Sequence, residues 1–238
     1  MKRTLCILCL LSVFGIMAQN NRSTNPKIGI KELFLQLPDS VFKKDSYLRG
    51  DDRKKLFTTA NQESDDEVSR PYIDEYDPQK GYLLISYTFF NGLRYQIWSL
   101  NLKGGQKLVV VNENDGKGHI HFFLEEKGVL KKALTDVPEI HSVQVDDFFE
   151  TSHLNTTEKE ALQYLLSRNK IVFEYELLYQ KRVIRMSIFS IGFDTDLPVM
   201  IDQDKLKYKQ VLFRWVNDKW IKEVQKWVDD RWVKEVQK

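Results

Sequence analysis

Cysteine is nearly absent from this chain, and both of its cysteines, Cys6 and Cys9, lie within the first 18 residues. The rest of the chain has no disulfide, so its stability must come from packing. It also has no thiol nucleophile. The sequence contains no Gly-x-Ser-x-Gly elbow, no P-loop and no dinucleotide fingerprint, which excludes the enzyme classes built on those motifs. We therefore predict no bound cofactor.

Long hydrophobic runs are also scarce, and the clearest one stands at the start of the chain. Lys2-Arg3 precedes an apolar run from Leu5 to Met17, and Ala18 offers a small residue for cleavage. This arrangement is typical of a secretory signal peptide over residues 1–18. An uncleaved anchor is the alternative, but the run is short for a membrane span. We expect export to the periplasm or the cell surface, and no transmembrane helix in the mature chain.

Net charge is the third quantity that this chain lacks. Without Lys2 and Arg3, 34 of the 36 basic residues remain, against 34 acidic residues. A formally neutral chain argues against strong, nonspecific binding to nucleic acid or to anionic membranes. We therefore predict no nucleic-acid partner.

Gly81 to Lys132 is the stretch that organises the rest of the chain. It contains four apolar, β-branched and aromatic runs, each interrupted by glycine, with Asn91-Gly92 between the first two. Asn-Gly between two such runs is a strong hairpin signal, because a type I′ turn needs positive φ at both positions. The stretch predicts an antiparallel meander. Both of its faces carry apolar groups, so we expect other parts of the chain to cover both.

Residues 19–27 are polar and predict a disordered leader. Apolar residues at helical spacing then predict a helix over Ile28–Leu37, a further turn at Val41-Phe42 and a short helix over Arg53–Ala60. These elements would cover one face of the meander. The segment from Asn61 to Lys80 is interpreted as an acidic linker. A calcium loop is the alternative, but the Asp-x-Asp-x-Asp-Gly spacing is missing.

The second half of the chain mixes strands with one amphipathic helix. Ser142 to Phe149 predicts a short strand running into a helical turn, and Thr157 with Glu160 predicts a capping box that opens a helix to Arg168. Ile171 to Ile191 predicts a hairpin that reverses at Gln180-Lys181, and Lys207 to Val216 predicts another strand. The fold class is therefore α+β, with about eight antiparallel strands and helices packed on a face. We expect one domain over residues 28–226, with a subdivision near 136–156.

The C-terminus contains an internal repeat of twelve residues. Trp215 to Lys226 is followed by a near copy over residues 227–238. Asn217-Asp218 predicts a hairpin turn in the first copy, whereas the second copy fits either an added strand or an amphipathic helix. One interpretation is a local duplication, with one copy packed and the other a dangling tail. The other is an aromatic binding surface formed by Trp215, Trp220, Trp227 and Trp232.

His119 and His121 form a His-x-His pair on a predicted strand, which would place both side chains on one face. They are the low-probability metal candidates of this chain. A catalytic zinc needs a third ligand, and His141, His153 or Glu125 are the residues available. The alternative is two ordinary strand histidines beside a turn.

Several short segments resemble an uncharacterised domain family of small exported proteins from Bacteroidetes-type bacteria. The resemblance is carried by Lys31–Ser40, Arg53–Phe57, Tyr82–Ile85 and Val145–Phe148, so it covers about Lys31 to Phe149. Lys54-Lys55 departs from the family, in which an acidic residue usually follows the arginine. The resemblance implies export and a β-rich fold, and it implies no catalytic residues.

These observations favour an exported, non-enzymatic binding or assembly module of the bacterial envelope, with a protein, peptide or glycan partner. The alternative is a metal- or carboxylate-dependent hydrolase that acts on envelope material. The second hypothesis requires a third ligand close to His119 and His121.

Overall fold

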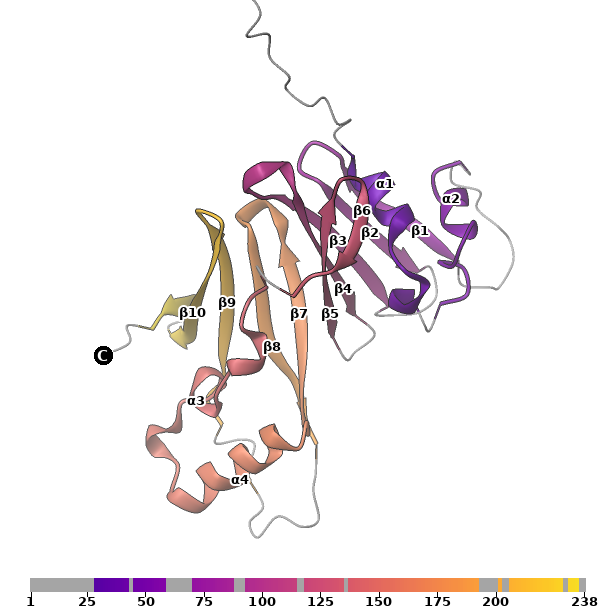
Figure 1. Cartoon of the computed structure of the whole chain (residues 1–238). Coiled ribbons are helices and arrows are strands. Elements are labelled where there is room, and N and C mark those ends of the chain that lie inside the picture. Colours follow the sequence, from indigo (N-terminus) through magenta and orange to yellow (C-terminus); the bar gives the residue numbers. More distant parts are fainter. Residues whose placement is uncertain are drawn as a thin grey trace, which may run out of the picture.

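The fold consists of two antiparallel sheets, each wound as a meander, with short helices around them (Figure 1). The computed structural model describes residues 28–42, 45–58, 70–87, 93–114, 118–134, 137–192, 201–202, 206–228 and 231–235. The first sheet has the order β1-β2-β3-β4-β5-β6, and the second has the order β11-β10-β9-β8-β7. The predicted α+β class and the meander are confirmed, although the two sheets contain more strands than expected.

The strands of the first sheet are β1 (Pro71–Asp77), β2 (Tyr82–Tyr87), β3 (Arg94–Asn101), β4 (Lys107–Asn114), β5 (His119–Glu126) and β6 (Val129–Lys132). Those of the second are β7 (Ile171–Leu178), β8 (Val183–Ile191), β9 (Lys209–Val216), β10 (Lys219–Val228) and β11 (Arg231–Lys234). The helices are α1 (Ile30–Gln36), α2 (Asp52–Lys55), α3 (Val145–Phe148) and α4 (Thr156–Ser167). Short 3-10 turns are η1 (Asp39–Phe42), η2 (Lys103–Gly105), η3 (Ile140–Ser142), η4 (Thr151–His153) and η5 (Tyr179–Lys181).

Both faces of the first sheet are buried, as its sequence predicts. Successive strand residues point to opposite faces. One face belongs to a core shared with α1 and η1, formed by Leu83, Ile85, Tyr95, Ile97, Val109 and Val111 together with Leu33, Phe34, Val41 and Phe42. The other face belongs to a core shared with the second sheet, formed by Tyr82, Trp98, Leu100, Leu108 and Val110 together with Leu177, Ile184, Met186, Val211, Phe213 and Trp215. The helix predicted over Ile28–Leu37 and the turn predicted at Val41-Phe42 are confirmed as α1 and η1. They cover one face of the first sheet, as expected.

Two side chains of the first sheet, and the backbone of Gly118 just before β5, bond to the free backbone edge of β7. The side-chain amide of Asn112 donates to the Tyr175 carbonyl at 2.6 Å, and the Leu177 N–H donates to Gln96 Oε1 at 3.1 Å. The Gly118 N–H donates to the Phe173 carbonyl at 3.1 Å. Buried backbone groups need hydrogen-bond partners. These bonds therefore join the two sheets in addition to the packing of side chains between them.

The second sheet carries α3 and α4 at one end (Figure 1). The helix α4 buries Ala161, Leu162 and Leu165, the apolar face that its sequence predicts. Its capping box is shifted by two residues from the prediction. Asn155 Oδ1 accepts the Glu158 N–H at 2.9 Å, and Glu158 Oε2 accepts the Asn155 N–H at 2.9 Å. Asn155 caps a helix as well as threonine does, so the overlapping Thr157–Glu160 pattern lies within the helix.

Three further predictions are wrong in detail. Part of the expected acidic linker is β1, which pairs with β2 along Pro71 to Asp77. Asp74 and Glu75 are exposed on β1, an edge strand, where charge also discourages pairing with other chains. The helical turn predicted before Phe149 is present as α3, but the strand expected in front of it is not formed, and η3 with a short connection lies there instead. The helix expected over Arg53–Ala60 is the single turn α2, followed by turns to Thr58.

Other predictions are confirmed or fall outside the described residues. The hairpin of β7 and β8 reverses through η5, as predicted at Gln180-Lys181. The signal peptide, the leader and the Asn91-Gly92 turn lie outside the described residues. Within the described part of the chain, no helix has the length and apolarity required to cross a membrane.

Candidate functional site

The hairpin of β9 and β10 presents a pair of tryptophans on the inner face of the second sheet. Asn217 and Asp218 form its turn, with φ of 50° and 62°. Both residue types tolerate this left-handed region, and a two-residue turn of this kind matches the twist of paired strands. Val216 and Lys219 form the strand pair next to the turn, and Trp215 and Trp220 form the following pair. Their rings are 5.0 Å apart between centroids and inclined by 64°.

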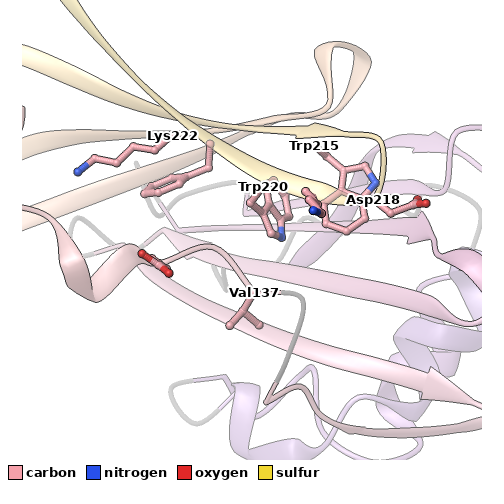
Figure 2. Close-up of a pocket in the computed structure, with 8 residues that line it drawn as sticks. Val137, Trp215, Asp218, Trp220 and Lys222 are labelled. Carbon is pink, nitrogen blue, oxygen red and sulfur yellow. The ribbon is translucent and has the colours of Figure 1, made fainter. Parts of the chain in front are cut away.

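A hollow of about 320 Å³ lies between this hairpin and the segment that precedes η3 (Figure 2). We call it the tryptophan groove. Its lining residues are Val137, Glu139, Phe213, Trp215, Asp218, Lys219, Trp220 and Lys222. Trp220 lies between the hairpin and the segment that carries Val137 (Figure 2). The groove thus combines a half-exposed indole with side chains of both charges.

Ion pairs lie at both ends of the groove. Lys222 Nζ lies 2.5 Å from Asp147 Oδ2, and the same carboxylate accepts the Gln144 N–H at 2.7 Å. Asp147 therefore caps α3 and ties it to β10. At the turn, Asp218 lies 3.3 Å from Lys103 of the first sheet, a contact that is exposed and contributes little to stability.

The second copy of the repeat is a strand, and it forms a second tryptophan pair. Trp227 of β10 pairs with Trp232 of β11, with centroids 5.2 Å apart and an inclination of 72°. These rings are 53% and 38% exposed, whereas Trp215 is 6% exposed. Because Trp227 stands seven residues after Trp220 on a regular strand, it faces the opposite side of the sheet. The four tryptophans therefore form two separate pairs and no single surface.

The outer face of the second sheet, on which the second pair lies, carries charged side chains as well as the exposed Ile221. Glu223 Oε2 lies 3.2 Å from Arg214 Nε and 3.4 Å from Lys234 Nζ, across three neighbouring strands. Burial raises the pKa of Glu223, but hydrogen bonds from Gln225 and Arg214 outweigh it and hold the pKa below its ordinary value. The second tryptophan pair thus lies on a charged face and outside any described hollow.

A second, larger hollow of about 740 Å³ surrounds the first half of β5, and we call it the histidine hollow. His119, His121 and His141 line it, together with Lys132 of β6 and Tyr175 of β7. His141, one of the suggested third ligands, thus lines the same hollow as the predicted pair, whereas His153 and Glu125 do not line it. Among the described residues, however, no three His, Cys, Asp or Glu side chains come together closely enough to hold a metal ion.

Sequence reasoning missed the far wall of the tryptophan groove. Val137 and Glu139 come from a connection with no motif, and only the fold places it opposite the hairpin. The position of Lys222 could have been predicted, because it lies two residues after Trp220 on a strand and so faces the same side of β10.

Comparison with known proteins supports the fold but assigns no family. No family model and no curated protein matches the chain. A domain of an uncharacterized protein from Porphyromonas gingivalis W83, a member of the Bacteroidetes, has a similar structure, with a TM-score of 0.51 and 14% sequence identity. The match covers 81% of this chain and 96% of that chain. At this identity the likeness concerns the fold alone.

Proposed function

We propose that this protein is an exported, non-enzymatic module of the bacterial envelope that binds a glycan in the tryptophan groove. The observation that carries the proposal is Trp220, a half-exposed indole in a hollow that also presents Glu139, Asp218 and Lys219. A sugar ring has an apolar C–H face that packs on an aromatic ring. Its hydroxyl groups donate and accept hydrogen bonds, which suits side chains of both charges.

A glycan fits the groove better than an extended peptide does. Peptides bound to sheets usually pair with an exposed backbone edge. The groove lies on the face of the β9–β10 hairpin, and its strand β9 is paired on one side with β8 and on the other with β10. Recognition in the groove therefore depends on side chains. A volume of about 320 Å³ accommodates one or two sugar units, at the small end of ligand pockets.

Export and membership of a small exported Bacteroidetes family belong to the same proposal. Residues 1–18 have the pattern of a signal peptide, and the structural neighbour comes from a member of that phylum. The hydrolase hypothesis has less support, because the convergent third ligand that it requires is missing among the described residues.

The test is a calorimetric titration of the purified protein with three hexasaccharides: N-acetylchitohexaose, cellohexaose and hexagalacturonate. We expect at least one to bind, and Trp220→Ala to weaken that binding about tenfold or more, because one lost aromatic contact is worth about 1.4 kcal/mol. Trp232→Ala is the matched control, since Trp232 is the repeat counterpart of Trp220 and lies on the other face. Equal losses in both variants, or binding of none of the three, would refute the groove as a glycan site.

A further inference from the structure

The second sheet ends in β11, a short strand whose outer side is paired with no other strand in the described part of the chain. All four of its residues, Arg231 to Lys234, are exposed. The Glu235 N–H donates to the Val224 carbonyl at 2.8 Å, so the backbone groups of Glu235 point toward β10. Bonding groups alternate in direction along a paired strand. The N–H and C=O groups of Trp232 and Lys234 therefore point to the outer side of the sheet.

The other three sheet edges are less open to a further strand. The edge of β7 already bonds to side chains of the first sheet. The pairing of β1 shifts register after Ile73, and β6 contains adjacent Lys131 and Lys132 but no acidic residue. Bulges and unmatched charges on an edge discourage pairing between molecules. By contrast, β11 pairs regularly with β10, and an acidic residue, Glu235, follows its basic ones.

The sequence from Arg231 to Glu235 is complementary to itself in an antiparallel register. It reads Arg-Trp-Val-Lys-Glu. When two such strands pair about Val233, Arg231 of each copy lies opposite Glu235 of the other, and Trp232 lies opposite Lys234. Opposite charges stabilise cross-strand neighbours, and so does a cation over an indole. The backbone groups of Trp232 and Lys234 are the ones that point outward, so hydrogen bonding selects the same register as charge does.

Glu235 is well placed for this contact. It shares the inner face of β11 with Arg231 and Val233, because alternate residues face the same side. Lys209, a buried lysine of β9, holds it at 2.9 Å, yet 31% of the Glu235 side chain remains exposed. A carboxylate has about four acceptor positions. Glu235 can therefore bind Arg231 of another copy without leaving Lys209.

We infer that this protein forms a weak symmetric dimer in which the β11 strands of two copies pair antiparallel about Val233. The partner is a second copy, because the charge pattern that complements Arg231 to Glu235 is the same segment reversed. A twofold axis at Val233 makes each pair of residues occur twice and joins the two second sheets into one. A single strand pair buries less than the roughly 1,000 Å² of a stable interface, so association depends on protein concentration. The tryptophan groove lies on the other hairpin and plays no part in this contact.

Cysteine cross-linking tests the dimer, because the chain has no cysteine after Cys9. Facing residues of a non-hydrogen-bonded antiparallel pair have Cα atoms about 4.5 Å apart, within the range of a disulfide. We expect purified Val233→Cys to form a disulfide-linked dimer with oxidised glutathione, seen by non-reducing electrophoresis. Ile221→Cys is the matched control and should link several-fold more slowly, since Ile221 is the repeat counterpart of Val233 and is more exposed, at 48% against 36%. Wild-type protein gives the background from Cys6 and Cys9.

Charge reversal tests the register. Arg231→Glu, added to Val233→Cys, places like charges opposite Glu235 and should slow linking about fivefold or more. Arg231→Lys in the same background keeps the opposite charges and should retain most of the rate. In unmodified wild-type protein, sedimentation equilibrium should show an average mass that rises from monomer toward dimer between about 10 μM and 500 μM. Thermal melting of each variant confirms that it is folded.

Four results would each refute the dimer through β11. They are equal linking of Val233→Cys and Ile221→Cys, faster linking of Ile221→Cys, linking that Arg231→Glu does not slow, and a wild-type mass that stays monomeric over the whole concentration range. None of these measurements uses a saccharide. They therefore decide the dimer separately from the glycan groove.

Discussion

Trp220 and Trp227 lie on the same strand, β10, and face opposite sides of the second sheet. Trp220 belongs to the first aromatic pair, with Trp215, and Trp227 belongs to the second, with Trp232. Successive hairpins of a meander turn at opposite ends, and seven positions along a strand reverse the face. The two copies of the repeat therefore place one aromatic pair in a groove and the other on the outer face of the sheet.

The two pairs differ in their contribution to stability, and the repeat provides the controlled comparison. Trp215 is almost fully buried in the core between the sheets, whereas its repeat counterpart Trp227 is 53% exposed. Trp215→Ala is expected to lower the free energy of unfolding by about 3–5 kcal/mol, the usual cost of truncating a buried aromatic residue. Trp227→Ala should lower it by less than about 1 kcal/mol. Urea denaturation measures both, and similar losses would show that the second pair is also part of the core.

Asn112 is predicted to hold the two sheets together. Its amide donates both to Gln96 Oε1 at 3.0 Å and to the Tyr175 carbonyl at 2.6 Å. Asn112→Leu keeps a similar size but leaves a buried carbonyl of β7 without that donor, at a cost of about 1–3 kcal/mol. Asn101→Ala, on the exposed end of β3, is the control and should change stability by no more than about 0.5 kcal/mol. An unchanged denaturation midpoint in Asn112→Leu would show that the hydrogen bonds of Asn112 do not help to hold the sheets together.

Stability should fall in alkaline solution because of Tyr175. Burial raises its pKa from 10.0 to about 12 in the folded protein. Between these values the unfolded chain loses the phenol proton and the folded chain keeps it, so ionisation favours unfolding as the pH rises. At pH 11 this contributes about 1 kcal/mol of destabilisation. Tyr175→Phe removes that contribution, so its unfolding free energy should decline less between pH 9 and pH 11 than that of the wild type. Parallel declines would contradict the assignment.

Local signals in the sequence were sufficient for most of the elements. Asn217-Asp218 between aromatic strands predicts the hairpin that carries Trp215 and Trp220, and apolar spacing predicts α1 and α4. The strand β1 was not predicted from the sequence. An edge strand needs only backbone pairing, so it can contain acidic residues such as Asp74 and Glu75, which give no strand pattern. The second repeat copy fitted a strand or a helix equally, and pairing with β10 selected the strand.

Only the hairpin side of the candidate site could be predicted from the sequence. The repeat identifies the tryptophans, but their division between two faces depends on the register of β10 with β9 and β11. The opposing wall at Val137 and Glu139 is set by how the chain crosses between the sheets. The same crossing brings His141 to the hollow of His119 and His121, a proximity that no spacing in the sequence encodes.

The most direct test of the glycan groove is a titration followed through the indole N–H signals in a ¹⁵N–¹H NMR spectrum. The chain has five tryptophans, of which Trp98 is buried and serves as an internal reference. On addition of hexagalacturonate or N-acetylchitohexaose, the signals of Trp215 and Trp220 should move while those of Trp227 and Trp232 stay in place. Movement of the Trp227 and Trp232 signals alone, or of none of the five, would contradict the account.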